Sequence, residues 1–312
     1  MEVTSQQIID LLTSQLSVWN LARANYEALQ KVEVKKIDFG DFAISVQFNP
    51  ARIQSSAAKV DAKTIQERKC FLCPANLPEV QKGIDYKNKY QILVNPFPIF
   101  PQHFTIPSYD HVDQLIFDRY EDMLDLAKSL DKFTIFYNGP KCGASAPDHA
   151  HFQAGNKGFL PIEQDVDILN KTIVKNEDGL LVYTIPNYLR NGLFIESTDK
   201  DKAVNFFKHL YALLHIPEGE KEPMMNIVTW YDSRKWYSSI IPRAKHRPEC
   251  FSAEGDANIL ISPASVDMGG VLITPLEKDF KKIRRQDISN IFEEVCIDNT
   301  RLKEIINQIK TV

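Results

Sequence analysis

The sequence predicts an α+β fold made of two related halves, residues 1–165 and 166–312, each with an antiparallel sheet flanked by helices. Segments rich in β-branched and aromatic residues occupy the middle of each half. Segments in which apolar residues recur with helical spacing lie on either side of them. The 312 residues contain no low-complexity tract and no long linker, so we expect one compact unit.

The first half begins with helical spacing at residues 5–30 and a hairpin in "KIDFGDFAISVQFNP" that turns at Gly40. Residues 51–70 are polar and irregular. The other elements expected in this half are the strands "YQILVN" and "HFTIP", a helix at about 112–130, the strand "KFTIFYN", and the loop "GPKCGASAPD" that leads into "HAHFQAG".

The second half repeats this sequence of elements. We expect a helix at about 199–215, followed by the charged loop "PEGEKEP". The strands "MNIVTWYD", "KWYSSIIP", "NILISP" and "GGVLITP" come next, and a helical region covers about 276–310.

Composition and charge exclude several classes of protein. The formal net charge is −4, so nothing indicates a nucleic-acid-binding protein, and a small anionic substrate would need a local basic cluster. The N-terminal residues "MEVTSQQIIDLL" do not form a signal peptide, and no apolar run is long enough to span a membrane. We therefore expect a cytoplasmic protein that acts on a small molecule, with neither a nucleic-acid nor a membrane partner.

The five cysteines do not form the pattern of a disulfide framework, because their number is odd and no secretion signal precedes them. Cys250 and Cys296 are expected to be buried as small apolar residues. Cys70 and Cys73, in "CFLCPAN", have the spacing of half a metal site or of a redox pair.

The segment "HAHFQ" alternates polar with small or aromatic residues, which is typical of a strand with one buried face. His149, His151 and Gln153 are expected on one face, and Ala150 and Phe152 on the other. One interpretation is a strand whose polar face is simply solvated. The preceding loop of small residues lets another group approach closely, and this favours a functional site.

The segment "NGPKCGASAPDHAHFQ" resembles the active-site segment of galactose-1-phosphate uridylyltransferases and their relatives in the histidine-triad superfamily. Those relatives include diadenosine tetraphosphate phosphorylases and GDP-L-galactose phosphorylases. The family pattern is an asparagine, a Gly/Ser-rich loop and His-x-His-x-Gln, which here are Asn138, Gly143, Ser145, His149, His151 and Gln153. The resemblance covers roughly residues 70–300. It implies a histidine-triad-like fold and suggests a homodimer.

The resemblance also implies a reaction. His151 would attack the α-phosphorus of a nucleotide and form a covalent nucleotidyl-histidine, which a phosphate or sugar-phosphate acceptor then takes up. Gln153, Ser145 and the amides of the Gly143 loop would donate hydrogen bonds to phosphate oxygens. The substrate would be a nucleoside diphosphate sugar or a dinucleoside polyphosphate. The base, the sugar and the acceptor stay open.

Two upstream segments are weaker candidates for ligand contacts. Asn95 and Phe97, in "VNPFP", match a region that touches ribose and base in the family; alternatively they form an exposed turn with Phe97 in the core. Arg52, Ser55 and Lys59 are candidates to bind phosphate or sugar.

A structural zinc site is a further implication of the resemblance. Cys70, Cys73, His111 and His149 match the ligand set of the uridylyltransferases, and thiolate and imidazole are ligands that zinc selects. His103 is the alternative to His111. The other interpretation is a buried thiol pair without metal.

The second half departs from the uridylyltransferase pattern at "YSSIIP", which lacks the histidines of that family's second metal site. This departure argues against galactose-1-phosphate as the substrate. Arg243, Lys245, His246 and Arg247 follow directly, and we expect the first three to bind phosphate. The alternative is a solvated basic loop.

Two other functions remain open. The first is a metal-dependent hydrolase in which His149 and His151 are both ligands, although such sites normally also use carboxylates, and Gln153 stands where one would be expected. The second is a non-catalytic, zinc-stabilised module that binds a nucleotide.

Overall fold

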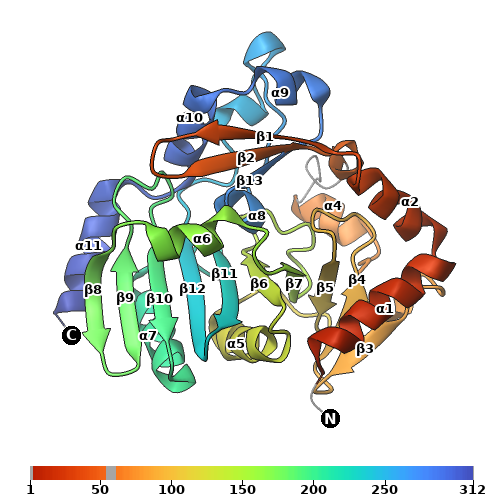
Figure 1. Ribbon diagram of the computed structural model, residues 1–312, viewed down its shortest axis with the longest axis horizontal. Helices are drawn as coiled ribbons and strands as arrows, with labels where there is room; N and C mark the ends of the chain where they lie inside the picture. The colour runs from red at the N-terminus through yellow and green to blue at the C-terminus, as the bar shows by residue number, and fades with distance from the viewer. Residues whose placement is uncertain (1–2, 54–60, 312) are drawn as a thin grey trace.

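A computed structural model describes residues 3–53 and 61–311 (Figure 1). Its helices are α1 (Ser5–Val18), α2 (Asn20–Leu29), α4 (Ala62–Glu67), α5 (Tyr120–Ser129), α6 (Pro161–Ile168), α7 (Lys200–Leu213), α8 (Ser265–Met268), α9 (Glu277–Lys282), α10 (Arg285–Val295) and α11 (Asn299–Lys310). Its strands are β1 (Glu33–Asp38), β2 (Ala43–Phe48), β3 (Gly83–Tyr86), β4 (Tyr90–Val94), β5 (His103–Pro107), β6 (Phe133–Asn138), β7 (His151–Asn156), β8 (Thr172–Glu177), β9 (Leu180–Thr184), β10 (Leu193–Ser197), β11 (Met225–Asp232), β12 (Lys235–Pro242) and β13 (Val271–Thr274).

Ten strands form one continuous antiparallel sheet in the order β3-β4-β5-β7-β6-β11-β12-β10-β9-β8. Its two sides repeat one arrangement from outer edge to centre, β3-β4-β5-β7-β6 on one side and β8-β9-β10-β12-β11 on the other. Helices α5 and α7 occupy corresponding places in the chain order of the two sides. The related halves share a single sheet because their innermost strands, β6 and β11, pair with each other.

A second sheet joins distant parts of the chain. Strands β1 and β2 form the predicted hairpin, and β13 pairs in parallel with β2. This small sheet lies across the top of the large one in Figure 1. The connection brings residues near 270 beside residues near 45, so the C-terminal part of the chain reaches the first half.

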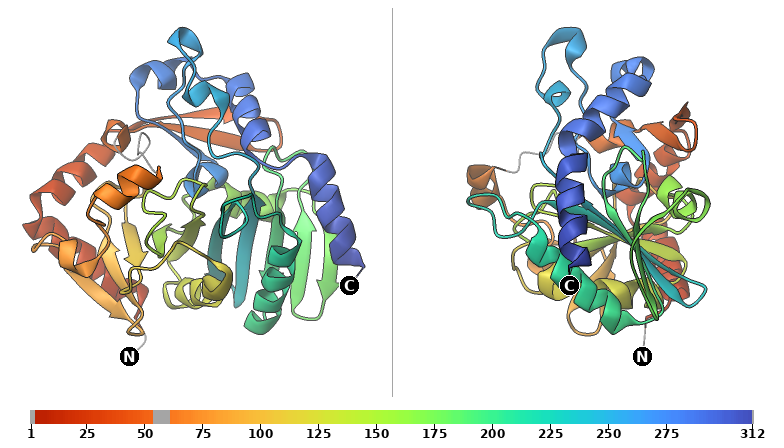
Figure 2. Two further views of the ribbon diagram at one scale, coloured as in Figure 1. Left: turned by 180° about the vertical axis from the view of Figure 1, so that it is seen from behind. Right: turned by 90° about the vertical axis from the view of Figure 1, so that its left-hand side faces the viewer.

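Each face of the large sheet is covered by a different set of elements. Helices α1, α5, α7 and α11 pack on one face and form one apolar core with it. The left view of Figure 2 shows α5, α7 and α11 on that face. The small sheet packs on the other face with α6, α8 and α10, around a second apolar core. Strand β7 separates the two environments, since Phe152 and Ala154 belong to the first core whereas His151 and Gln153 face the other way.

The predicted helix at residues 5–30 is two helices. Trp19 adopts an extended conformation between α1 and α2, with φ −104° and ψ 95°. Its indole is buried, with 6% of its surface exposed. Burial of this large aromatic side chain accompanies the break in the helical repeat.

The helix expected at about 112–130 begins only at Tyr120. Residues 111–116 have no helical structure and place Gln114 in the interior, where it is 1% exposed, and a short 3-10 helix at Phe117–Arg119 then leads into α5. The side chain of Gln114 makes hydrogen bonds to backbone groups of two strands, which a helix at this point would not allow.

The segment "NILISP" is not a strand, although Ile259 and Ile261 are buried. The N–H of Leu260 donates to a carboxylate oxygen of Asp279 (2.8 Å) instead of to a neighbouring strand. The alternation of Ile259 and Ile261 therefore reflects burial without strand pairing. Conversely, β3, α6, β8, β9 and β10 were not expected.

No helix in the described residues is long and apolar enough to cross a membrane.

Candidate active site

A cavity of about 500 Å³ opens on the face of the large sheet that the small sheet covers, above β4, β5, β7 and β6. Its polar lining includes residues that the sequence singled out, namely Asn95, Asn138, Gly143, Ser145, His151 and Gln153, and Phe97 also lines it. The sheet supplies the floor, and residues of the α8–β13 region supply one wall.

His151 is held as a neutral imidazole with its Nδ1 bonded. Nδ1 lies 2.8 Å from the carbonyl oxygen of His149, which can only accept, so Nδ1 carries the hydrogen. Burial lowers the pKa of His151 to about 4. The lone pair is therefore on Nε2, and the side chain lines the cavity.

Gln114 fixes the backbone of His151. Its Oε1 accepts the N–H of His151 (2.7 Å), and its Nε2 donates to the carbonyl oxygens of His151 (2.9 Å) and Asn138 (3.0 Å). The pairing of β6 with β7 ends where Phe136 lies opposite Gln153. Gln114 thus bridges the two strands where they diverge and the cavity begins.

Gln153 is oriented by His103. His103 Nδ1 accepts the N–H of Ile99 (3.1 Å), so the hydrogen is on Nε2 and points to Gln153 Oε1 (3.0 Å). Burial and the nearby charge of Arg52 lower the pKa of His103 to about 3, which keeps it neutral. The amide NH₂ of Gln153 is then the group available to donate to an oxygen in the cavity.

The small-residue loop enters the cavity through Gly143 and Ser145. Gly143 has φ +94°, and a Cβ there would lie 2.5 Å from the Cβ of Ala264, so only glycine fits. Asn138 Oδ1 accepts from the N–H of Ser265 (2.7 Å) and from Asn226 (3.1 Å). These bonds tie the end of β6, where the loop begins, to β11 and to the start of α8.

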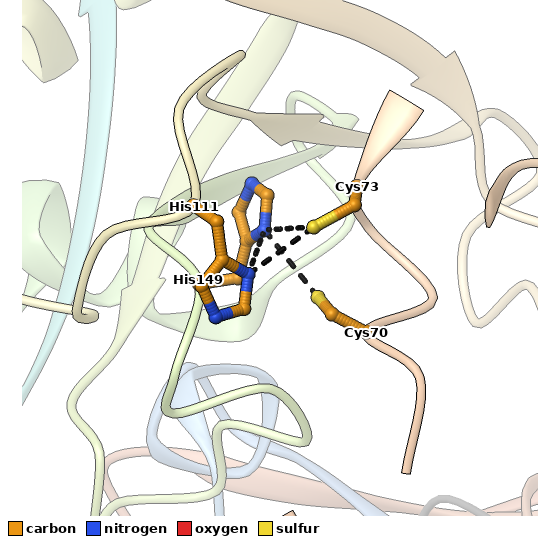
Figure 3. A group of neighbouring side chains, drawn as sticks. All are labelled: Cys70, Cys73, His111 and His149. Atoms are coloured by element: carbon orange, nitrogen blue, oxygen red, sulfur yellow. Dashed lines mark hydrogen bonds between the residues drawn. The ribbon is translucent and has the colours of Figure 1, made fainter. Parts of the chain in front are cut away.

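Two cysteines and two histidines meet beside this loop (Figure 3). The ligating atoms of Cys70, Cys73, His111 and His149 all lie within 4.8 Å of one another. Cys70 Sγ is 3.4 Å and Cys73 Sγ 3.6 Å from His149 Nδ1, and Cys73 Sγ is 3.2 Å from His111 Nδ1. The residue that joins the pair is thus His111, while His103 lies at Gln153.

The donors of this cluster fit a metal such as zinc. His149 Nε2 lies 2.8 Å from the carbonyl oxygen of Ser108, so Nε2 carries the hydrogen and Nδ1 is free to ligate. Burial alone would raise the pKa of Cys70, but the adjacent His149 ring and hydrogen bonds from backbone amides lower it to about 6. A thiolate and an unprotonated imidazole are the forms that zinc binds.

His149 differs from the expectation for the strand. It precedes β7, which begins at His151, and its ring is directed to the two cysteines. The two histidines of "HAH" therefore belong to different sites. They remain connected, because the carbonyl oxygen of His149 holds His151 Nδ1.

The structure does not bring the predicted basic cluster to the cavity. Arg243 is 5% exposed, and its guanidinium donates to Asn226 Oδ1 and to the carbonyl oxygens of Pro263, Val295, Lys245 and His246. Lys245 pairs with glutamates at the surface, and burial lowers the pKa of His246 to about 4. Arg243 thus braces the rear of the cavity wall.

Asn95 and Phe97 form a turn at the edge of the cavity. Asn95 Oδ1 accepts the N–H of Phe97 (2.9 Å), and Asn95 Nδ2 donates to Thr105 Oγ1 (3.0 Å). Arg52 Nη1 donates to the carbonyl oxygen of Phe97 (2.7 Å), and Arg52 also lines the cavity. Ser55 and Lys59 lie outside the described residues.

Sequence reasoning missed three lining residues in particular: Trp19, Arg68 and Asp267. Trp19 lies in a stretch with helical spacing, and Asp267 lies far along the chain, so neither carries a local signal. Arg68 stands two residues before Cys70, and a charge so close to the cysteine pair was the one available indication.

Residues 11–156 match a protein family described only as a domain of unknown function, DUF4922. The comparison with curated proteins found no match.

Solved structures of the yeast Ap4A phosphorylase Apa2 are similar over most of the chain. One is 15% identical, with a TM-score of 0.58 over 89% of this chain and 96% of that one. The complex with AMP is 16% identical, with a TM-score of 0.59 over 95% and 97% of the two chains. The complex with Ap4A is 15% identical, with a TM-score of 0.51 over 89% and 96%. The chain therefore has the α+β, histidine-triad-like fold of these phosphorylase structures, as the sequence predicts.

Proposed function

We propose that this protein is a phosphorylase or nucleotidyltransferase that cleaves a dinucleoside polyphosphate or a nucleoside diphosphate sugar through a nucleotidyl-His151 intermediate. The observation that carries the proposal is the state of His151. Its Nδ1–H is held by the carbonyl oxygen of His149, and its neutral ring lines the cavity beside Gln153. A buried imidazole with a free Nε2 lone pair is a nucleophile at cellular pH.

In the first step, Nε2 of His151 attacks the α-phosphorus, and the bond from that phosphorus to the bridging oxygen breaks. The departing phosphate leaves with the bonding electron pair. The imidazole becomes positively charged, and the carbonyl oxygen of His149 (2.8 Å from Nδ1) stabilises that charge. In the second step, an oxygen of the acceptor attacks phosphorus and the phosphorus–nitrogen bond breaks, which restores the neutral imidazole.

Donors around the phosphorus are neutral. The NH₂ of Gln153, fixed by His103, and the hydroxyl of Ser145 line the cavity, as does the loop at Gly143. Such donors stabilise the charge on the non-bridging oxygens during the displacement at phosphorus. Gln114 keeps the backbone of His151 in register with this loop.

The fold supports a dinucleoside polyphosphate as the first substrate to test, because the similar yeast structures include complexes with AMP and with Ap4A. Apolar and aromatic side chains at the cavity, among them Trp19, Phe71 and Phe97, suit the packing of a base.

For the Cys/His cluster, we propose zinc with a structural role. Four protein ligands leave no open position, so the metal would supply no Lewis-acid chemistry. It would fix His149, and through the His149 carbonyl oxygen it would hold the ring of His151.

The test is covalent labelling. Protein incubated with α-³²P-labelled Ap4A and then denatured should retain the label, and intact-mass analysis should show the added nucleotidyl group. His151→Ala should abolish the adduct, whereas His215→Ala, which changes an exposed histidine, should label like the wild type. Equal labelling of wild type and His151→Ala would contradict the mechanism.

A further inference from the structure

The cavity wall carries few positive charges for a site that is proposed to bind several phosphates. Among the described residues that line it, the only lysine or arginine side chains are Arg52 and Arg68. The basic residues Arg243 and Lys245 do not line it. Within the part of the chain that the structure describes, these two arginines are therefore the groups available for charge compensation of a polyphosphate.

Arg52 is already engaged by the protein. Its Nη1 donates to the carbonyl oxygen of Phe97 (2.7 Å). It also lies in the field of Asp267, a buried carboxylate that accepts the N–H groups of Ala264 and Ile273. Asp267 lines the same wall, so its negative charge offsets much of what Arg52 would offer to an anion.

The guanidinium of Arg68 is held in place by its neighbours, but not all of its N–H groups have a hydrogen-bond acceptor. Its Nη2 is bonded to Asp148 Oδ1, and its guanidinium lies 5.0 Å from the ring centre of Phe71. Asp148 Oδ2 is 3.7 Å from His111 Nε2, so the same carboxylate contacts the Cys/His cluster. Arg68 Nη1 is buried and has no hydrogen-bond partner. Leaving such a buried donor unpaired is unfavourable, and an acceptor bound in the cavity would satisfy it.

We propose that Arg68 binds the phosphate group that leaves in the first step and the phosphate that enters in the second. This inference rests on the proposed function. The α-phosphate bears one negative charge and meets neutral donors, Gln153 and Ser145, whereas the departing phosphates bear more charge and need a cation. The leaving group departs opposite His151, and the acceptor must approach along the same line, so one anion subsite serves both.

Isothermal titration with inorganic tripolyphosphate tests this subsite independently of the base. Wild type should bind, and Arg68→Gln should weaken binding about 10- to 100-fold, the loss expected for a charged hydrogen bond. Arg68→Lys keeps the positive charge but lacks the planar guanidinium that can donate two parallel hydrogen bonds. We expect a smaller loss of affinity than with Arg68→Gln. Lys245→Gln removes a cation outside the cavity and should bind like the wild type. Circular dichroism and protein-bound metal are compared across the four proteins.

Three results would overturn the inference: no binding of tripolyphosphate to wild type, equal affinity of Arg68→Gln and wild type, or an equal loss with Lys245→Gln. Failure of the proposed function is a different result. If wild type binds tripolyphosphate through Arg68 but never forms an adduct at His151, the anion subsite stands and the nucleotidyl intermediate does not.

Discussion

Replacing His103 with glutamine is expected to change how strongly acid destabilises the protein. His103 is fully buried, and its Nδ1 accepts the N–H of Ile99 while its Nε2 hydrogen points to Gln153. Protonation would place a second hydrogen on Nδ1 and break the bond from Ile99. Burial, reinforced by the charge of Arg52, accordingly lowers the pKa of His103 to about 3.

The sign and size of the effect follow from this pKa. In the unfolded chain, His103 titrates near its ordinary value of 6.5, so below that pH the unfolded state binds a proton that the folded state does not. The free energy of unfolding therefore decreases as the pH is lowered from about 6.5 to about 3. From pH 7.5 to pH 5.0 the loss due to His103 alone is about 2 kcal/mol.

Urea unfolding followed by tryptophan fluorescence measures this loss at the two pH values. His103→Gln should be less stable than wild type at pH 7.5, because it changes two buried hydrogen bonds. It should, however, lose about 2 kcal/mol less on acidification than wild type does. The matched control is His215→Gln, an exposed histidine, which should follow wild type. If wild type and His103→Gln lose equal free energy between the two pH values, His103 is not held neutral by burial.

Three other substitutions test the site. Gln114→Ala should slow adduct formation at His151 by about 10- to 100-fold in rapid-quench assays, because the nucleophile loses its backbone clamp, and an unchanged rate would argue against this role. Arg243→Met should lower the free energy of unfolding by about 3 kcal/mol in urea titrations, since five acceptors lose their donor, while the folded variant should keep its affinity for tripolyphosphate. Gly143→Ala should cost about 1–3 kcal/mol, measured by thermal unfolding, because φ is +94° and the new Cβ meets Ala264; an unchanged melting temperature would show that the loop can move aside.

Local patterns predicted the central part of the site. The alternation of "HAHFQ" correctly separates Phe152, in the core, from His151 and Gln153, at the cavity. The small residues before it form the loop that reaches the cavity, and the "CFLC" pair lies beside two histidines. These features depend on neighbours in sequence, so the sequence reports them directly.

Features that depend on distant contacts were not predictable in the same way. The basic residues that begin at Arg243 resemble a phosphate site in the sequence. The guanidinium of Arg243, however, donates to carbonyl oxygens that only the folded chain brings together. Arg68 has no motif of its own, and Asp148 and Phe71 give it its orientation. The prediction that the helix begins near residue 112 was wrong. The side chain of Gln114 instead makes hydrogen bonds to backbone groups of β6 and β7.

The pairing of β6 with β11 limits where this chain can be cut. The family match ends at residue 156, the last residue of β7, and so contains every strand of the first side of the sheet. A fragment with those limits would leave β6 as a bare, apolar edge in the middle of the former sheet, and such edges recruit other chains. It would also lack Asp267 and Ile273, which line the cavity. The segment that bears His151 is thus not a unit for separate expression, and exchanging it between related proteins requires the partner strand to travel with it.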